Sequence, residues 1–370
     1  MQKLRVGVAG LGRAFQVMAP ALRLDPRVEL IGGCDPRPGA EVPGKSFPSV
    51  EALCSSPDID VVYVATPHQF HAEHACLAAQ HGKHVLVEKP MALSLEECRR
   101  MIGAARQAGV QLVVGHSHSF DLPIKKTREL IRSGRFGKLR MITALNFTDF
   151  LYRPRRPEEL DTARGGGAVF NQAAHQVDIV RMLSQERISS VRAHAGNWDA
   201  ARPTEGAYSA LLGFEDGAFA TLAYSGYAHF DSDELMGWVG EMGQKKDPAQ
   251  YGAARRTLDD RNKYAPRKAE APSHHQHFGL VIASCERADL RPLPGGVMIY
   301  ADAEKRLAPL PPPKVPRVEV IDELYDSAVN DKPPLHSGEW GMATLEVCLA
   351  ILESSKLQRE IELNRQPKSA

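Results

Sequence analysis

The sequence predicts an α/β fold with two domains, the first built on a parallel sheet and the second an α+β domain with an open, mostly antiparallel sheet. Up to about residue 120, short apolar segments alternate with helical ones, which calls for a parallel sheet with helices on both faces. Beyond residue 137, long extended runs joined by turn signals are typical of antiparallel strands. A chain of 370 residues is long enough for two cores, which we place in residues 1–121 and 122–370.

The first predicted strand, residues 4–9, leads directly into a glycine turn and a helix over residues 16–24. In such a turn, backbone N–H groups face a phosphate and the helix dipole favours its charge. The third position of the dinucleotide-binding fingerprint is normally Gly or Ala and serves helix packing. Here it is Phe15, and an ordinary strand-to-helix turn is the alternative. The cofactor-binding residues expected in this turn are Gly10, Gly12, Arg13, Ala14 and Phe15.

The second predicted strand, residues 28–34, ends in Asp35, about twenty residues after the turn, as in dinucleotide-binding domains. A carboxylate there can hydrogen-bond the ribose hydroxyls of adenosine, so the first domain is predicted to be a Rossmann domain. Asp35 favours NAD over NADP, because a 2′-phosphate would meet like charge. Arg37 could turn toward such a phosphate, so NADP remains an alternative.

Later strands of the first domain end in polar segments, and ligands of parallel sheets bind at the carboxyl ends of the strands. The elements predicted here are helix 49–55, strand 61–65, helix 72–80, strand 84–87, helix 94–108 and strand 111–115. For the two histidines at 68 and 71, helix capping is the alternative. The expected cofactor-binding residues are Thr66, Pro67, His68, His71, Glu88, Lys89 and Pro90, and the expected substrate contacts include His116 and His118.

Lys89 stands out because it follows an apolar strand and precedes a proline. Proline restricts the residue before it to extended geometry, which fixes the direction of the lysine. At the nicotinamide edge of the sheet, Lys89 is expected to take part in proton transfer and to contact substrate. A solvated strand end is the alternative.

The second domain is predicted to consist mainly of strands. One face of an open antiparallel sheet is free for substrate or for a partner subunit. A polar stretch at residues 239–272 is predicted to be a long loop or flap, and helices over residues 319–330 and 337–357 close the chain and could pack back on the first domain. The predicted strands are 139–150, 188–197, 207–214, 218–227, 277–284 and 296–301.

A second motif lies between the two halves, where Gly165-Gly166-Gly167 precedes a helix. Asn171, His175 and Asp178 are spaced four and three residues apart, so they share one face of that helix. A lone helical histidine is usually structural. The polar stripe behind three glycines instead indicates that His175 and Asn171 act on substrate.

Three arginines, Arg153, Arg155 and Arg156, precede the triple glycine. Arginine pairs bind planar carboxylates bidentately, so these residues are expected to contact a carboxylated substrate. An exposed basic turn without a ligand is the alternative.

Composition excludes several other classes. A net charge of +1 gives no argument for nucleic-acid or membrane binding, and no apolar run approaches the length of a membrane span, so we expect a cytoplasmic protein. Six widely spaced cysteines indicate buried free thiols. Histidine clusters near residues 68–74 and 274–277 lack a known metal-ligand spacing, and no metal site is predicted.

The chain resembles the family of glucose-fructose oxidoreductase, inositol dehydrogenase and MocA (Gfo/Idh/MocA). The resemblance spans nearly the whole chain through the glycine turn, Thr66-Pro67, Glu88-Lys89-Pro90 and the triple-glycine block. It implies an NAD(P)-dependent oxidoreductase that forms a homo-oligomer, a dimer or tetramer, through the outer face of its sheet. It also implies that Lys89 and His175 handle the proton of the substrate hydroxyl. Many members have Asp where this chain has Asn171, and an amide cannot take a proton, so Asn171 would orient substrate or bond Lys89.

Within the family, residues 10–15, 171–176 and 277–287 are similar to the branch of phthalate 4,5-dihydrodiol dehydrogenases. This similarity implies hydride transfer from a secondary alcohol of a cyclic substrate. The substrate it implies first is a carboxylated aromatic cis-dihydrodiol such as phthalate 4,5-dihydrodiol. A sugar or inositol dehydrogenase is the main alternative. An NAD-dependent glycosidase and a non-catalytic, nicotinamide-sensing regulator are further ones.

Overall fold

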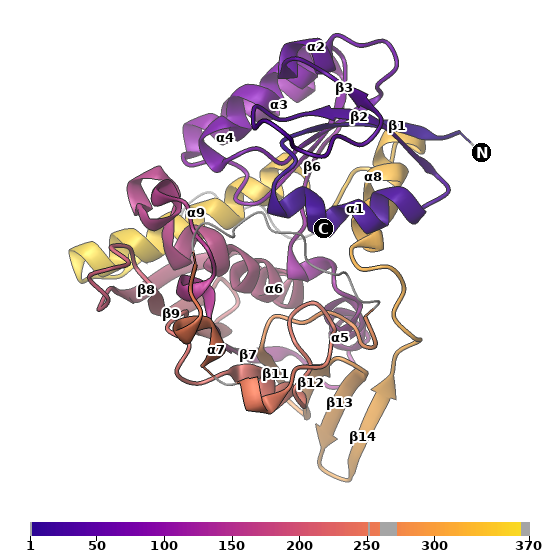
Figure 1. Ribbon diagram of the computed structural model, residues 1–370. Helices are drawn as coiled ribbons and strands as arrows, with labels where there is room; N and C mark the ends of the chain where they lie inside the picture. The colour runs from indigo at the N-terminus through magenta and orange to yellow at the C-terminus, as the bar shows by residue number, and fades with distance from the viewer. Residues whose placement is uncertain (1, 251, 260–271, 364–370) are drawn as a thin grey trace. The chain divides into compact units, whose positions relative to one another are not determined.

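The computed structural model describes residues 2–250, 252–259 and 272–363 (Figure 1). They form two compact units: the first contains residues up to His116 together with Lys314–Leu345, and the second contains Ser117–Pro313 and the residues from Glu346 onward. One unit is built on a parallel sheet and the other on a mostly antiparallel sheet, so the predicted fold class is confirmed.

The sheet of the first unit has six parallel strands in the order β3-β2-β1-β4-β5-β6. Strand β4 is buried along its whole length and β5 is buried from Val85 to Val87, as is typical of parallel sheets with both faces covered. In sequence order the strands are β1 (Leu4–Ala9), β2 (Val28–Cys34), β3 (Lys45–Ser46), β4 (Val61–Val64), β5 (His84–Val87) and β6 (Leu112–Val114).

Helices cover both faces of this sheet. On one face α1 contacts α8, and on the other α2, α3 and α4 follow one another (Figure 1). A capping box between Ser94 and Glu97 begins α4, and Gly109 in the left-handed region ends it, because these residues satisfy the terminal backbone groups. The helices are α1 (Arg13–Leu24), α2 (Val50–Cys54), α3 (His71–Gln80), α4 (Leu95–Ala108) and α8 (Val318–Val329).

The sheet of the second unit has nine strands in the order β14-β13-β12-β11-β7-β10-β9-β8-β15. All neighbours are antiparallel except β7 and β10. The strands are β7 (Leu139–Phe147), β8 (Ile188–Gly196), β9 (Ala207–Phe214), β10 (Phe219–Ser225), β11 (Leu280–Cys285), β12 (Ala288–Leu293), β13 (Gly296–Ala301), β14 (Glu304–Pro309) and β15 (Ile361–Glu362).

Two helices, α5 (Leu122–Arg132) and α6 (Ala174–Ser184), pack on the same face of the second sheet. On the other face, side chains of β9 and β10 such as Leu211 and Phe219 are exposed. The last helix, α9 (Gly338–Leu357), has residues in both units.

Some predicted elements of the second half differ from the structure. The strand predicted for 139–150 ends at Phe147, because residues 150–152 form a 3-10 turn. The stretch predicted as one long loop, 239–272, contains a 3-10 turn, Pro248–Gln250, and the short helix α7, Ala253–Arg256; residue 251 and most of its second half lie outside the described residues. All six cysteines are free thiols; four are buried as predicted, whereas Cys76 and Cys285 are partly exposed.

Candidate active site

The glycine turn lies where β1 meets α1. Gly10 has a φ of +90°, and a Cβ there would lie 2.7 Å from the carbonyl oxygen of Ala65, so the position requires glycine. The helix begins at Arg13 with Gly12 as its N-cap, three residues earlier than predicted. Glycine brings no side chain to the positive end of the helix dipole and leaves room for a phosphate there. Phe15 is buried, in keeping with a packing role.

Asp35 ties the end of β2 to the glycine turn. Its carboxylate accepts hydrogen bonds from the Leu11 amide (2.8 Å) and from the Arg37 amide, Nε and Nη2 (3.0, 2.8 and 2.8 Å). Burial alone would raise the pKa of Asp35, but these bonds hold it below its usual value. A carboxylate has about four lone-pair sites, so a ribose would have to displace Arg37 from Asp35.

His71 joins two strand ends that were predicted to border the nicotinamide. Its Nε2 lies 2.8 Å from the carbonyl oxygen of Thr66, and its Nδ1 lies 2.9 Å from that of Pro90. Burial lowers the pKa of His71, and a neutral imidazole has one N–H, so His71 donates to one of these carbonyls at a time. The ring is completely buried, so its contacts in this structure are internal. Pro67 precedes a 3-10 turn that starts at His68.

Glu88, next to Lys89, is held by two residues that were not foreseen. The Tyr63 hydroxyl donates to its Oε1 at 2.5 Å, and Arg317 Nη1 lies 3.7 Å from the same oxygen. All three side chains are largely buried. The Lys89–Pro90 peptide bond is cis. This network fixes the backbone on the N-terminal side of Lys89.

In the second unit, the helix behind the triple glycine starts with a π-helical turn, Val169–Ala173, and continues as α6. The predicted α-helical spacing therefore holds for His175 and Asp178 but not for Asn171, which lies in the π turn. Asp178 accepts a hydrogen bond from Ser119 Oγ (3.3 Å) and lies 3.9 Å from Arg181. Since α6 is buried all round, Asp178 belongs to the interior of the unit.

Each position of the triple-glycine motif requires glycine for a structural reason. Gly165 and Gly167 have φ of +82° and +81°, and a Cβ on Gly166 would lie 2.6 Å from the Glu159 carbonyl oxygen. Asn171 Nδ2 donates to the carbonyl oxygens of Gly167 (2.8 Å) and Gly165 (3.3 Å). The glycine loop therefore fixes the amide of Asn171.

His175 lies in a compact group of rings with His118 and Phe278. The centroid of the His175 ring lies 4.8 Å from the centroid of the His118 ring and 4.8 Å from that of the Phe278 ring. The centroids of His118 and Phe278 are 4.9 Å apart. Two carboxylates hold the ring of His118. Its Nδ1 lies 2.7 Å from Asp121 Oδ2, and its Nε2 lies 3.4 Å from Glu241 Oε1. The structure thus brings together two predicted site residues and adds three that were not predicted.

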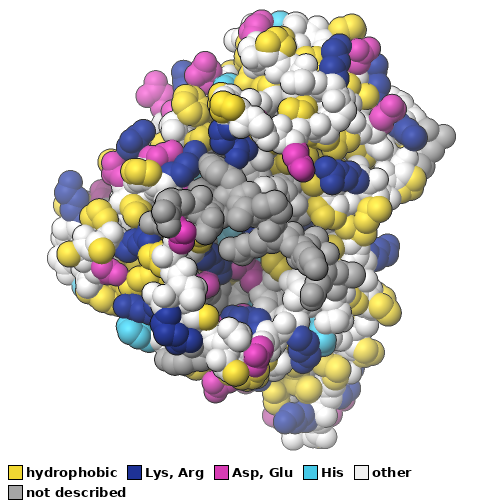
Figure 2. Space-filling view, viewed as in Figure 1, with side chains coloured by type: hydrophobic (Ala, Val, Ile, Leu, Met, Phe, Trp, Pro, Cys, Tyr) yellow, Lys and Arg dark blue, Asp and Glu magenta, His cyan; other side chains and the backbone are white. Residues whose placement is uncertain are grey.

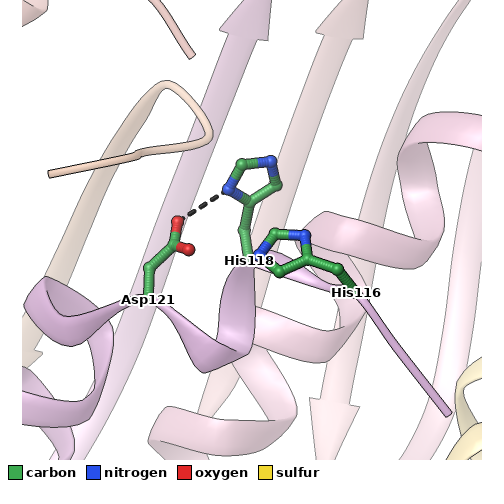
Figure 3. Close-up of side chains that lie close together, drawn as sticks. All are labelled: His116, His118 and Asp121. Atoms are coloured by element: carbon green, nitrogen blue, oxygen red, sulfur yellow. Dashed lines mark hydrogen bonds and ion pairs between the residues drawn. The ribbon is translucent and has the colours of Figure 1, made fainter. Parts of the chain in front are cut away.

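His118 is a buried cation. Burial opposes protonation, but the Asp121 and Glu241 carboxylates outweigh it and raise the pKa of His118 from 6.5 to about 9. Figure 3 shows the hydrogen bond between His118 and Asp121. It also shows His116, which precedes His118 by two residues in the chain. The ligand atoms of these three residues lie within 4.8 Å of one another. Two of the three, His118 and Asp121, form an ion pair in this structure.

The charge of His118 makes a prediction about stability. Because folding raises the pKa of His118, its charge contributes fully to the free energy of unfolding below pH 6.5. This contribution is lost as the pH rises through about 9. Replacing Asp121 by Asn should therefore lower the free energy of unfolding by about 2 kcal/mol below pH 6.5, and by clearly less above pH 9. Urea unfolding of both proteins across this range measures the difference; an equal loss at both ends would contradict it.

The three predicted arginines do not form one clamp. Arg153 pairs with Asp149 (2.8 Å) and Glu241 (3.4 Å), and Arg156 lies 3.2 and 3.4 Å from two following glutamates. Arg155 donates to the Phe150 carbonyl oxygen (2.9 Å), its guanidinium lies 3.9 Å from the centre of the Phe150 ring, and its Nη1 lies 4.0 Å from Glu159 Oε1. Burial lowers the pKa of Arg155 to about 10. Of the three side chains, that of Arg155 is the least exposed and makes the longest ion pair, so it is the one best suited to a further carboxylate.

The fold and these residues define a class of protein, an oxidoreductase with a nicotinamide-binding Rossmann unit. Residues 4–116 match the model of an oxidoreductase family with an NAD-binding Rossmann fold, and residues 124–244 match the GFO/IDH/MocA C-terminal domain. The chain belongs to the GFO/IDH/MocA family, as the sequence motifs predicted, and is an NAD-dependent dehydrogenase that acts on alcohols.

Known proteins support this assignment. The 1-carboxy-3-chloro-3,4-dihydroxycyclohexa-1,5-diene dehydrogenase of Comamonas testosteroni is 48% identical over 95% of both chains. The myo-inositol 2-dehydrogenase of Thermotoga maritima is 27% identical over 65% of this chain and 74% of its own. A crystal structure of a dehydrogenase from Bordetella bronchiseptica RB50 has a TM-score of 0.92 at 42% identity, covering 98% of this chain and 100% of that one.

The distribution of charge over the surface agrees with the composition of the sequence. Acidic and basic side chains are mixed over the face seen in Figure 2, in keeping with the net charge of +1. Within the described residues, every helix is too short or too polar to cross a membrane.

Proposed function

We propose that this chain oxidises a secondary alcohol of a carboxylated cyclic cis-diol, with NAD as the hydride acceptor. The observation that carries the proposal is the largely buried guanidinium of Arg155, which lies over the Phe150 ring in the unit that also holds His175. A planar guanidinium binds a carboxylate bidentately, and the attraction between opposite charges is stronger where water is excluded. The relative from Comamonas testosteroni is named for a substrate with one carboxylate and two hydroxyls on a ring.

Aromatic side chains in the second unit support a flat ring as the substrate. Tyr224 stacks on Tyr208 and Phe278, with ring centroids 5.5 and 6.4 Å apart and interplanar angles of 10° and 8°. Stacked aromatic rings suit an unsaturated ring as a partner, whereas a sugar or inositol needs a hydrogen-bond partner for each hydroxyl. This favours the dihydrodiol over the inositol alternative.

In the proposed reaction, Lys89 and His175 take the proton from the substrate hydroxyl, while bound NAD supplies the acceptor for hydride from the carbinol carbon. Asn171 donates its amide N–H groups to the glycine loop, and its carbonyl oxygen orients the hydroxyl. The residues of the glycine turn and of the strand ends named above are proposed to bind the cofactor. The arginines are proposed to bind the substrate carboxylate.

A substrate screen tests the proposal. The purified chain would be offered NAD or NADP with carboxylated cis-dihydrodiols, uncarboxylated cis-dihydrodiols, inositols and hexoses, and NADH formation would be followed by absorbance. We expect the carboxylated diols to have the highest kcat/KM, and Arg155→Met to remove that advantage. Oxidation of inositols or hexoses without any oxidation of carboxylated diols would overturn the proposal.

The choice between NAD and NADP should depend on the pair formed by Asp35 and Arg37. Because Arg37 occupies the carboxylate that a ribose needs, Arg37→Ala should raise the preference for NAD over NADP by about tenfold. Asp35→Ala should move the preference the other way, since Arg37 would be left to meet a 2′-phosphate. The measurement is kcat/KM for both cofactors. A shift in the same direction for both variants would disprove this role.

We also propose that the chain is a homo-oligomer, a dimer or tetramer, that works in the cytoplasm. Exposed Leu211 and Phe219 on one face of the second sheet support an interface there, and six free thiols suit a reducing compartment. Light scattering should give a dimer or tetramer, and a monomer at micromolar concentration would refute the interface. Cell fractionation tests the compartment, and recovery outside the cytoplasm would refute it.

A further inference from the structure

The helix that carries Asn171 and His175 begins without a capping side chain of its own. Its first amides need partners because no preceding turn of helix supplies them. Ala168, at the N-cap of the π turn, makes no side-chain cap bond. The partner comes from a distant segment: the Ala168 amide donates to the Glu205 carbonyl oxygen (2.9 Å), and the Val169 amide donates to Glu205 Oε1 (3.0 Å).

Glu205 is itself fixed on several sides. It lies just before β9 and is 8% exposed. Its second carboxylate oxygen accepts hydrogen bonds from the hydroxyls of Thr162 and Thr204, whose oxygens lie 2.8 Å apart. Thr162 belongs to the loop before the triple glycine, so the carboxylate joins that loop, the β9 segment and the start of the helix.

The glycine loop leaves room for this carboxylate. A Cβ on Gly167 would collide with the Glu205 carboxylate, and the φ of Gly167 is +81°. The Gly167 carbonyl oxygen in turn accepts the bond from Asn171 Nδ2. A continuous path of contacts therefore leads from Glu205 through Gly167 to Asn171, and through Val169 along the helix to His175.

We propose that Glu205 is a positioning residue of the reaction: it caps the helix that presents Asn171 and His175, and so sets their positions toward the substrate. This inference rests on the proposed function, because it takes those two residues to act on the substrate hydroxyl. Glu205 itself touches neither substrate nor cofactor.

The test compares Glu205→Ala with Glu205→Gln, which keeps an oxygen for the Val169 amide. Alanine should lower kcat by about ten- to a hundredfold, as displaced catalytic groups do, and leave KM for NAD unchanged; Gln should restore kcat to within about threefold of the wild type. Exposed Glu215, at the other end of β9, supplies the control, and Glu215→Ala should change nothing.

A second readout does not need turnover. Hydrogen exchange followed by mass spectrometry should show faster exchange in peptides covering residues 162–175 for Glu205→Ala, and protection near the wild-type level for Glu205→Gln. Gly167→Ala should mimic Glu205→Ala, and the double variant Gly167→Ala/Glu205→Ala should lose less than the product of the single losses, because the two changes disrupt one contact.

The outcomes separate cleanly. Unchanged exchange in Glu205→Ala would overturn the cap, and faster exchange with wild-type kcat would overturn the positioning role. Equal loss of kcat in the Ala and Gln variants would also overturn it. If Glu205→Ala does not fold, Thr162→Val removes one bond to the carboxylate and is judged by the same criteria. The proposed function fails separately, if His175→Ala keeps its turnover.

Discussion

Replacing Lys89 by Ala is expected to lower kcat by about a hundredfold or more, while NAD still binds. Lys89 follows β5, at the edge of the first sheet where ligands bind, and the Tyr63 and Arg317 contacts to Glu88 hold the backbone beside it. The loss should therefore appear in the chemical step. Measurements are kcat with the best substrate of the screen and NAD affinity by titration.

Two further variants sharpen this prediction. Lys89→Arg keeps the charge but not a titratable proton, because a guanidinium does not lose its proton in this range; it should be nearly as inactive as Lys89→Ala. Lys3→Ala removes an exposed lysine of the same unit and should behave as wild type. Normal turnover in Lys89→Arg would show that charge, and not proton transfer, is what Lys89 supplies.

Replacing His175 by Ala should cause the second large loss, again about a hundredfold or more in kcat. The ring is 5% exposed and lies between His118 and Phe278, so the change removes the proposed base. It also leaves a cavity, and His175→Asn, which fills more of the space without accepting a proton, separates the two effects.

The matched control for His175 is His194, an exposed histidine on β8 of the same unit. His194→Ala should keep wild-type turnover. Near-normal turnover in both His175 variants would refute the role of base, and a loss in Ala alone would assign His175 to packing.

Much of the fold followed from the sequence because its signals are local. Strands β9 and β13 have the predicted bounds, and the order of elements in the first unit is the predicted one except for the two-residue strand β3, which was not predicted. Strand β14 was missed because Glu304, Lys305 and Arg306 give it no apolar alternation; it is an edge strand and largely exposed. Helix α5 was also missed, although Pro123 in its first turn and apolar Ile124 and Ile131 on one face were signals for it.

The site was predictable only where chemistry and sequence coincide. Lys89 and His175 lie in recognisable motifs, whereas their supporting residues come from far along the chain. Arg317 reaches Glu88, and Glu205 reaches Val169, through tertiary contacts that leave no spacing in the sequence. The three arginines are neighbours in the chain, but their surroundings differ: Arg153 and Arg156 pair closely with local carboxylates, whereas Arg155 lies 4.0 Å from Glu159 and against the Phe150 ring.

The most direct test of the account follows one hydrogen atom. A carboxylated cis-dihydrodiol carrying deuterium at the carbinol carbon would be converted with NAD, and the nicotinamide and the ring product would be analysed by mass spectrometry. The account predicts one deuterium on the reduced nicotinamide for each diol oxidised, and a slower rate than with the protium substrate. Deuterium retained in the ring product, or bond cleavage without net NADH, would contradict it.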